Sequence, residues 1–372
     1  MKQGWEYKKL GDCTQILDSQ RKPVTKKDRI GGIYPYYGAT GIQDYVDKYI
    51  FDGRYVLVGE DGAKWSAFEQ SAFIIEGKSW VNNHAHVLKP HDLLVDTFLI
   101  YFLNYSDLDS YISGAIVRKL TQASLRNIDI PLPPKSTQLS IVSELDKINE
   151  LIRLKKEQLK DYNNLAQSIF YEMFGDPVEN EKGWEVKKIG EIGSVERGAG
   201  ISKKDFAEDG LPCIHYGQLH TILGARTKKH YTSIPHNLLP KYKVAHTGDL
   251  VMAITSEDVE GSCKSTAWLG NYDVIVGSDA AILHHEQDGT FLSYYTMTKA
   301  FYNEKAKYAK GFKVTHISTK EIEKISVFLP PLPLQHLFAQ RIEQIEHQKS
   351  EVAKAITDLE TLLASRMQHW FE

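Results

Sequence analysis

Lysine and arginine residues stand beside aromatic residues and glycines at several points of this 372-residue chain. Cations neutralise phosphates, and planar or bidentate groups read base edges, so this mixture is what a DNA-binding loop requires. The candidates in the first half are Lys26, Lys27, Arg29, Tyr36, Tyr37, Gly38, Lys64, Trp65, Arg118 and Lys119. Those in the second half are Lys203, Lys204, Arg226, Lys228, Lys229, Lys264, Lys310 and Lys313. For any single residue, a solvated surface charge is an equally good interpretation.

A second pattern could support catalysis. Asp61 is followed by Glu76 and Lys78, a spacing similar to the metal-binding core of many nucleases. The two carboxylates could bind Mg²⁺, with the lysine near the attacking water. The corresponding text of the second half has Asn271 and Asp273 instead, and short Glu-x-Lys strings are common. A Mg²⁺-dependent nuclease is therefore the weaker alternative.

Histidine and cysteine residues offer little to a metal. His84 and His86 would lie on one face of a strand, but two ligands without a third are more typical of hydrogen-bonded histidines. The three cysteines, Cys13, Cys213 and Cys263, are far apart and odd in number, which argues against a disulfide framework and a zinc cluster. The sequence has no P-loop, dinucleotide-binding fingerprint or methyltransferase motif. We expect the chain to bind no metal or cofactor and to catalyse nothing alone.

The composition is that of a globular protein. Charged residues make up 25% and hydrophobic residues 42% of the chain, and the formal net charge is −3. DNA binding would therefore depend on local basic loops. The start lacks an apolar signal core, and no run approaches the ~18 apolar residues that a membrane span needs, so we expect a cytoplasmic protein without membrane contact.

The chain repeats itself. At an offset of 197 residues, Leu132-Pro133-Pro134 falls on Leu329-Pro330-Pro331, Gln138 on Gln335, and Gly114 on Gly311. At an offset of 179, Gly4-Trp5 falls on Gly183-Trp184. The second copy thus carries 18 additional residues, and insertions concentrate in loops, where binding functions also lie. Arg118 and Lys313 are the better DNA-binding candidates because each follows the repeated glycine.

Two long amphipathic stretches follow the Leu-Pro-Pro motifs, and apolar residues recur in both at alternating spacings of three and four. This spacing predicts helices that pack along their length on another helix. The seam of the first is Ile141, Leu145, Ile148, Ile152, Leu159, Tyr162 and Ile169. The seam of the second is Phe338, Ile342, Ile345, Val352, Ile356, Leu359 and Leu363. Because the first helix ends where the second copy begins, the two must pair antiparallel. Lys155 and Lys349 interrupt the seams and either fix the register or extend their ammonium groups to water, and we favour the second reading.

The rest of the sequence predicts an α+β fold with two pseudo-repeated domains separated by a pair of long antiparallel coiled-coil helices. The predicted strands are residues 55–59, 72–75, 249–254 and 273–276, and the predicted shorter helices are residues 97–111 and 290–308. The predicted boundaries are a first domain at 1–134, a central helix at 135–175, a second domain at 176–331 and a C-terminal helix at 332–372.

In this order, and present twice, the motifs resemble the specificity subunits of Type I restriction–modification systems. The residues that carry the resemblance are Ile130-Pro131-Leu132-Pro133-Pro134 with Gln138, Phe174-Gly175-Asp176-Pro177 with Gly183-Trp184, and Leu329-Pro330-Pro331 with Gln335. The resemblance implies that each domain is a target-recognition domain reading one half of an asymmetric, bipartite sequence in double-stranded DNA. It also implies that the helices set the distance between the halves.

The resemblance further implies the partners. Two methyltransferase subunits, docked on the helices, would use S-adenosylmethionine, and motor subunits with endonuclease activity would use ATP and Mg²⁺. A helix of about 36–39 residues is ~55 Å long, more than the ~34–36 Å between successive major-groove sites, so its length suits this role. A stand-alone DNA-binding or regulatory protein remains an alternative.

Overall fold

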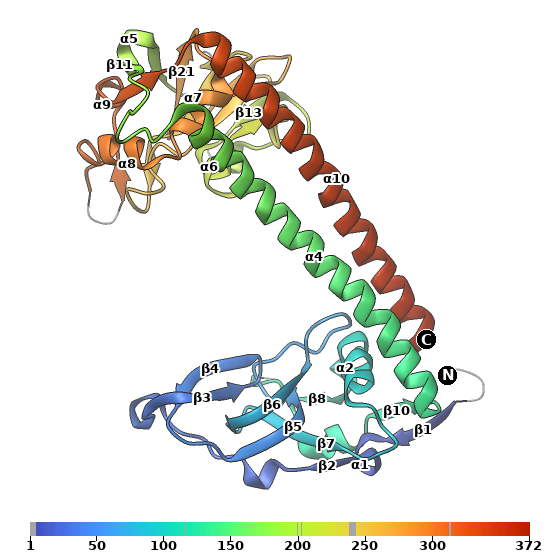
Figure 1. The fold of residues 1–372 in the computed structure, drawn as a ribbon. Coiled ribbons are helices and arrows are strands. Elements are labelled where there is room, and N and C mark those ends of the chain that lie inside the picture. The colour runs from blue at the N-terminus through green and yellow to red at the C-terminus, as the bar shows by residue number, and fades with distance from the viewer. Residues whose placement is uncertain (1–4, 115, 199, 202, 238–242, 312–313) are drawn as a thin grey trace. The chain divides into compact units, whose positions relative to one another are not determined.

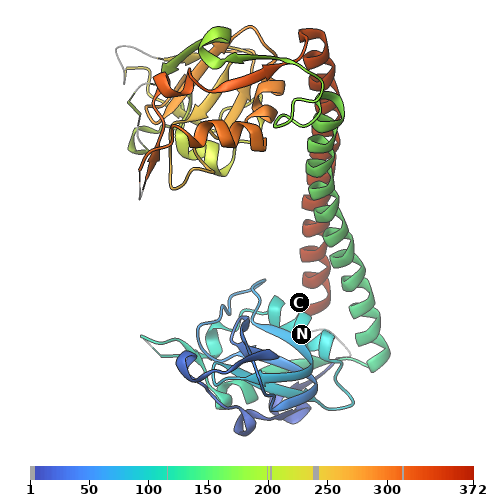
Figure 2. The same cartoon turned by 60° about the vertical axis from the view of Figure 1, so that its left-hand side comes forward.

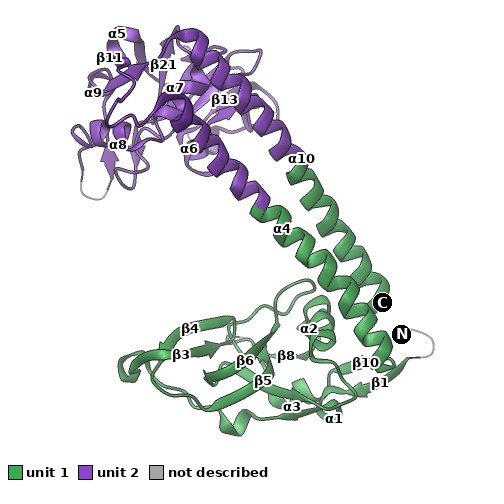
Figure 3. Cartoon of the chain, in the orientation of Figure 1, with its two compact units in different colours: residues 1–157, 352–372 green, residues 158–351 purple. Residues whose placement is uncertain are grey.

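In the computed structural model, the described residues are 5–114, 116–198, 200–201, 203–237, 243–311 and 314–372. The chain divides into two compact units, residues 1–157 with 352–372 and residues 158–351 (Figure 3). Each unit includes part of both long helices, α4 (Lys135–Phe174) and α10 (Leu332–Phe371). The prediction of an α+β fold with two repeated globular parts and two long helices is confirmed.

The first unit is built on a six-stranded sheet with the order β2-β7-β5-β6-β3-β4 (Figure 1). Neighbouring strands are antiparallel except for β3 and β6, which are parallel. The strands of this sheet are β2 (Thr14–Ile16), β3 (Gly31–Gly38), β4 (Gly41–Val46), β5 (Phe51–Gly59), β6 (Ala72–Val81) and β7 (Ala85–Pro90). Two short ladders are β1 (Glu6–Lys9) with β10 (Asp129–Leu132), and β8 (Ile112–Ser113) with β9 (Lys119–Leu120). The shorter helices are α1 (Leu10–Cys13), α2 (Asp96–Tyr105) and α3 (Gln122–Arg126), with 3-10 turns at η1 (Asp18–Gln20), η2 (Lys26–Asp28) and η3 (Asp109–Tyr111).

Both faces of this sheet are buried, because successive side chains of a strand point to opposite sides. Val56 and Val58 of β5 join the core that contains Phe98 of α2 and Ile141 of α4. Leu57, between them, joins a second cluster on the other face. The first part of α4 therefore shares its core with the sheet.

The second unit contains a five-stranded sheet, β12-β21-β17-β19-β14, and a four-stranded sheet, β15-β13-β20-β16. The five strands are β12 (Gly193–Arg197), β14 (Arg226–Thr227), β17 (Leu250–Ala253), β19 (Ser265–Trp268) and β21 (Ala280–His285). The four strands are β13 (Leu211–Ile214), β15 (Thr232–Ile234), β16 (Val244–Ala245) and β20 (Val274–Val276). The short ladders are β11 (Glu185–Lys188) with β23 (Ser326–Leu329), and β18 (Thr255–Ser256) with β22 (Thr315–His316). The shorter helices are α5 (Ile189–Ile192), α6 (Tyr216–Thr221), α7 (Gly289–Tyr295), α8 (Lys299–Ala306) and α9 (Thr319–Ile322), with a 3-10 turn at η4 (Lys203–Asp205).

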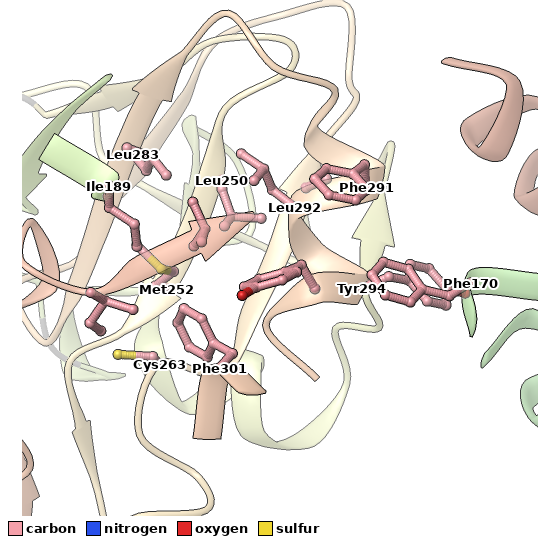
Figure 4. Close-up of a cluster of buried hydrophobic side chains, with 14 of the residues drawn as sticks. Phe170, Ile189, Leu250, Met252, Cys263, Leu283, Phe291, Leu292, Tyr294 and Phe301 are labelled. Atoms are coloured by element: carbon pink, nitrogen blue, oxygen red, sulfur yellow. The ribbon is translucent and has the colours of Figure 1, made fainter. Parts of the chain in front are cut away.

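The five-stranded sheet is also buried on both faces. Leu250 and Met252 of β17 face the helical core, while Val251 faces the cluster that includes Trp268 and residues of β20. Phe170 of α4 stacks on Phe291 of α7, with ring centroids 5.8 Å apart. Both belong to the buried cluster drawn in Figure 4. The end of α4 is therefore part of the core of the second unit.

The repeated glutamine of the sequence motif is fully buried in both units. Gln138 accepts a hydrogen bond from the Val95 N–H (2.8 Å) and donates to the Pro133 carbonyl (2.9 Å). Gln335 accepts from the Asp288 N–H (3.0 Å) and donates to the Pro330 carbonyl (2.8 Å). Since Val95 and Asp288 are the N-caps of α2 and α7, each amide joins a long helix to the short helix of its unit.

Within each unit α4 and α10 lie side by side and antiparallel (Figures 1 and 2). In the first unit Ile141 and Leu145 share a core with Met367, and in the second Phe170 contacts Phe338. The seam residues that are buried are Ile141, Leu145, Ile148, Ile152, Phe338, Ile342, Ile345, Val352 and Ile356. The half-buried ones are Leu159, Tyr162, Ile169, Leu359 and Leu363.

Two predicted helices are shorter in the structure. Residues 97–111 form α2 only as far as Tyr105, followed by a 3-10 turn. Residues 290–308 form two helices, because the Thr298 side chain accepts the Phe301 N–H and caps a new helix, α8. None of the helices among the described residues has the length and apolar character needed to cross a bilayer.

Most of the extra length of the second copy lies before β17. Gly59 and Ala253 end equivalent strands, since each is the last residue of the strand flanked by β7 and β6, or by β21 and β19. They are 194 residues apart, against an offset of 179 near the start of the copies, so 15 of the 18 extra residues precede this point. The enlarged stretch carries α6, β14 and β15.

Candidate nucleic-acid interface

The β8–β9 hairpin of the first unit presents Arg118 and Lys119. The turn needs Gly114, whose φ is +95° and whose added Cβ would lie 2.1 Å from the Val117 carbonyl oxygen. Arg118 is exposed and pairs with Asp109 at 2.7 Å. Lys119 pairs with Glu60 at 2.7 Å and is half-buried. Both cations are thus held on a turn that only glycine permits.

The second unit repeats this turn at Gly311, whose φ is +124° and whose added Cβ would lie 1.9 Å from the Val314 carbonyl oxygen. Lys310 is exposed and pairs with Glu321 at 2.7 Å. The hydrogen bond from Lys310, followed by those from Ser318, lowers the pKa of Glu321 to about 2. Lys313 lies outside the described residues.

A buried polar network supports the first hairpin. His86 is fully buried, with Nδ1 2.6 Å from Asp18 Oδ2 and Nε2 2.7 Å from the Leu120 carbonyl. Both ring nitrogens of His86 thus lie within hydrogen-bond distance of an oxygen atom. Arg21 lies 2.5 Å from Glu60 and 3.3 Å from Asp18. The network therefore ties the base of the hairpin to the sheet.

Burial by itself raises the pKa values of Asp18 and Glu60, but both end below their ordinary values. His86, Gln122 and the Val87 N–H lower that of Asp18, and Lys119 and Arg21 lower that of Glu60. Among the described residues, Asp18, Glu60 and His86 form the group whose ligand atoms lie close enough for a metal. Because Arg21 and Lys119 already neutralise these carboxylates, the cluster fits an ion-pair network and not a cation site.

Several predicted contact residues are interior, which corrects those predictions. Tyr36 is 1% and Trp65 4% exposed, so neither ring is free to stack on a base. Trp65 donates to the Gly59 carbonyl at 3.1 Å, and the Arg29 guanidinium lies 4.2 Å from the centroid of the Tyr36 ring while pairing with Asp44 at 3.1 Å. Buried Gly38 and half-buried Tyr37 continue β3, and burial raises the pKa of Tyr37. These aromatic residues belong to the fold because they supply the apolar surface of a small sheet.

Arg226 is also corrected. Its side chain is 10% exposed and pairs with Glu343 of α10, and Lys228 pairs with the same carboxylate at 2.7 Å. Burial lowers the pKa of Arg226. Arg226 therefore joins β14 to the long helix within the second unit instead of facing a ligand.

The other predicted lysines are exposed: Lys26, Lys27, Lys64, Lys203, Lys204, Lys229 and Lys264. Lys203 and Lys264 line a groove of about 1330 Å³ in the second unit. Three further sets of residues line it: α6 with Tyr216, the loop with Glu257 and Asp258, and the start of α8 with Lys299. The sequence did not single out these additional residues, although the longer second copy pointed to this region.

The proposed nuclease residues do not converge. Glu76 pairs across the sheet with Arg54, whereas Asp61 lies beyond the other end of β5. Asp61 is seven positions after Arg54, and most of the intervening residues are extended in β5, so the two are roughly 20 Å apart. Asp61 instead lies 2.5 Å from His84 Nδ1, and the Lys78 ammonium lies 4.7 Å from the centroid of the Tyr49 ring. The nuclease hypothesis for this trio is therefore wrong.

Residues 2–162 and 181–360 match the family described as the Type I restriction modification DNA specificity domain. The chain belongs to this family. The two matched ranges each run from the first strand of one copy into the long helix that follows it. The internal repeat is thus a repeat of the specificity domain.

Relatives of the same family span nearly the whole chain. The putative type I restriction enzyme specificity subunit S.HindORF215P of Haemophilus influenzae is 27% identical over 360 residues, which cover 94% of this chain and 90% of that protein. The MjaVIII specificity subunit of Methanocaldococcus jannaschii is 23% identical over 397 residues, which cover 96% of this chain and 92% of that protein.

The fold is also that of a solved specificity subunit. The Type I restriction–modification S subunit from M. genitalium aligns with a TM-score of 0.59 at 12% identity, covering all of this chain and 98% of that chain. A chain from a structural study of complex assembly in the type I system aligns with a TM-score of 0.58 at 19% identity, again covering all of this chain and 98% of that chain. These similarities support the specificity-subunit fold predicted from the motifs.

Proposed function

We propose that this member of the specificity-subunit family recognises a bipartite, asymmetric sequence in double-stranded DNA. Residues 1–134 and 176–331 are the two target-recognition domains, and each reads one half of the target. The observation that supports this most is that the specificity domain occurs twice, once in each copy. Two domains with different sequences suit two different half-sites, whereas a symmetric site would suit identical ones.

The helices at 135–175 and 332–372 fix the number of base pairs between the halves. α4 and α10 each contain 40 residues, so each helix is about 60 Å long. Its rigidity would come from the buried seam, which continues through both units. A fixed gap in the target is the expected consequence.

The same helices dock two methyltransferase subunits. Four leucines of α4 remain between 45% and 51% exposed, namely Leu139, Leu151, Leu154 and Leu165. Exposed apolar side chains along a helix are typical of an interaction surface. Motor subunits with endonuclease activity complete the complex.

The chemistry belongs to the partners. S-adenosylmethionine would serve the methyltransferase subunits, and ATP and Mg²⁺ the motor subunits. The chain itself supplies DNA contacts through exposed cations such as Arg118, Lys64 and Lys264. Purified chain with Mg²⁺ is expected to leave duplex DNA intact, and the variant Glu76→Ala to behave as the parent does.

Sequencing of methylated bases in cells that carry this chain with its partners tests the function. The expected result is one motif with two specified halves and a fixed unspecified gap. A continuous palindromic motif, or none, would contradict the proposal. A stand-alone DNA-binding protein would instead purify without methyltransferase subunits and bind tightly alone.

A further inference from the structure

The loop after the central strand occupies the same place in both units. In the first unit residues 60–71 connect β5 to β6, and in the second residues 254–264 connect β17 to β19. The Gly59 N–H donates to the Ser71 carbonyl at 2.9 Å, as the Ala253 N–H donates to the Lys264 carbonyl at 2.9 Å. The two loops can therefore be compared directly.

The two loops differ in which charged side chains they leave without a salt-bridge partner. In the first loop Glu60 pairs with Arg21 and Lys119, Asp61 pairs with His84, and the exposed Lys64 pairs with Glu69 at 3.2 Å. In the second loop Glu257, Asp258 and Glu260 are all exposed and line the groove. Among the described residues neither Glu257 nor Glu260 forms a salt bridge, although the charge of Glu260 interacts with the buried Lys305 ammonium.

Hydrogen bonds from a buried lysine hold the main chain of the second loop. Lys305 is 4% exposed, and its ammonium donates to the carbonyls of Glu260 (2.8 Å) and Ser262 (2.6 Å). Asp258 Oδ1 accepts the Gly261 N–H at 2.7 Å, and buried Cys263 has a φ of +56°. A buried ammonium is costly unless its bonds are satisfied, so this arrangement fixes the main chain that presents the two glutamates.

Carboxylates in a DNA interface are repelled by phosphates and can only accept hydrogen bonds. In the major groove the donors are the amino groups of cytosine (N4) and adenine (N6). The exposed lysines on the same groove, Lys264 and Lys299, suit the neighbouring phosphates.

We infer that Glu257 and Glu260 determine the specificity of the second domain by accepting a hydrogen bond from a cytosine or adenine amino group. In the first domain the corresponding loop carries the exposed Lys64, and a lysine suits guanine O6 or N7. This inference rests on the proposed function.

The test uses the full chain with its methyltransferase subunits and the motif found for the parent. The variants are Glu257→Gln, Glu260→Gln and their combination, with Glu286→Gln as an exposed control outside the groove. In these variants, methylation is expected no longer to require one particular base pair in one half of the motif. Discrimination against other base pairs at that position should fall on the order of tenfold. Lys64→Gln is expected to change only the other half, and Glu286→Gln neither.

Binding to target and unrelated duplexes distinguishes base reading from simple repulsion. If the glutamates only repel phosphates, the variants will bind both duplexes more tightly by the same factor, and the motif will not change. Equal tightening on both duplexes would overturn the inference, and so would an unchanged motif. A parent that methylates no bipartite motif would contradict the proposed function itself, which is a separate result.

Discussion

Gln138 Oε1 accepts the main-chain N–H of Val95 at 2.8 Å, and this bond joins the start of α4 to the start of α2. Gln335 makes the equivalent bond to Asp288 in the second unit. The spacing of this glutamine behind Leu-Pro-Pro is therefore explained by structure, since the amide satisfies main-chain groups on both sides of the joint.

Replacing this amide should destabilise the joint. Gln335→Ala leaves the Asp288 N–H and the Pro330 carbonyl without their partner, and is expected to lower the free energy of unfolding by about 1–3 kcal/mol. Urea unfolding of the chain measures it. Gln340→Ala, exposed on the same helix, should have little effect. Equal losses for the two variants would show that the buried amide has no special role.

Truncating a buried seam residue near the end of a long helix should lower the stability of the chain. Phe338 is fully buried, with ring centroids 5.5 Å from Phe170 and 5.3 Å from Tyr294. Phe338→Ala is expected to cost about 3–5 kcal/mol in thermal or urea unfolding. Its neighbour Leu337 is 44% exposed, so Leu337→Ala should cost far less. A similar cost for both would argue against a seam.

Acid should weaken the first unit through its ion-pair network. The pKa values of Asp18 and Glu60 are lowered in the folded chain, so the unfolded chain binds protons first as the pH falls. Their contribution is complete above the ordinary carboxyl range and is lost as the pH falls through the lowered values. Unfolding midpoints measured between about pH 7 and pH 3 should show this loss.

The variant Asp18→Asn isolates that contribution. It should be less stable near neutral pH, because His86 and Arg21 lose a buried partner. Its midpoint should also depend less on pH than that of the parent. Asp52→Asn, which changes an exposed carboxylate, should follow the parent curve. Parallel curves for parent and Asp18→Asn would refute the assignment.

Lys264 should contribute a phosphate contact without sequence preference. Lys264→Ala is expected to weaken binding of the methyltransferase complex to target and unrelated DNA alike, and to reduce the slope of log affinity against log salt by about one. Titrations at several salt concentrations measure the slope. Lys160→Ala, exposed on α4, serves as the control. An unchanged slope for Lys264→Ala would remove this residue from the interface.

The helix pair should set the gap in the target. Deleting residues 153–159 and 353–359 removes one heptad from each helix, which shortens the pair by about 10 Å and keeps the faces nearly aligned. Sequencing of methylated bases should then show a gap shorter by about three base pairs, or no methylation if the complex no longer fits DNA. An intact gap of parental length would refute the spacer role.

The sequence alone determined the repeat, the two helices and the family. Periodic apolar spacing and glycine turns are local signals, which is why the seams and the turns at Gly114 and Gly311 could be read directly. Gly114 and Gly311 are required because an added Cβ would overlap the main-chain carbonyl three residues ahead.

Only the tertiary structure decided which polar and aromatic residues are available to DNA. In the sequence, Tyr36, Trp65 and Arg226 resemble DNA-contact residues, but in the structure they are enclosed by the sheet and by α10. Glu257 and Glu260 belong to no sequence motif. Their position is defined only by the groove and by the buried Lys305 that binds the main chain of their loop. Burial and ion pairing arise between residues distant in the chain, and no local pattern encodes them.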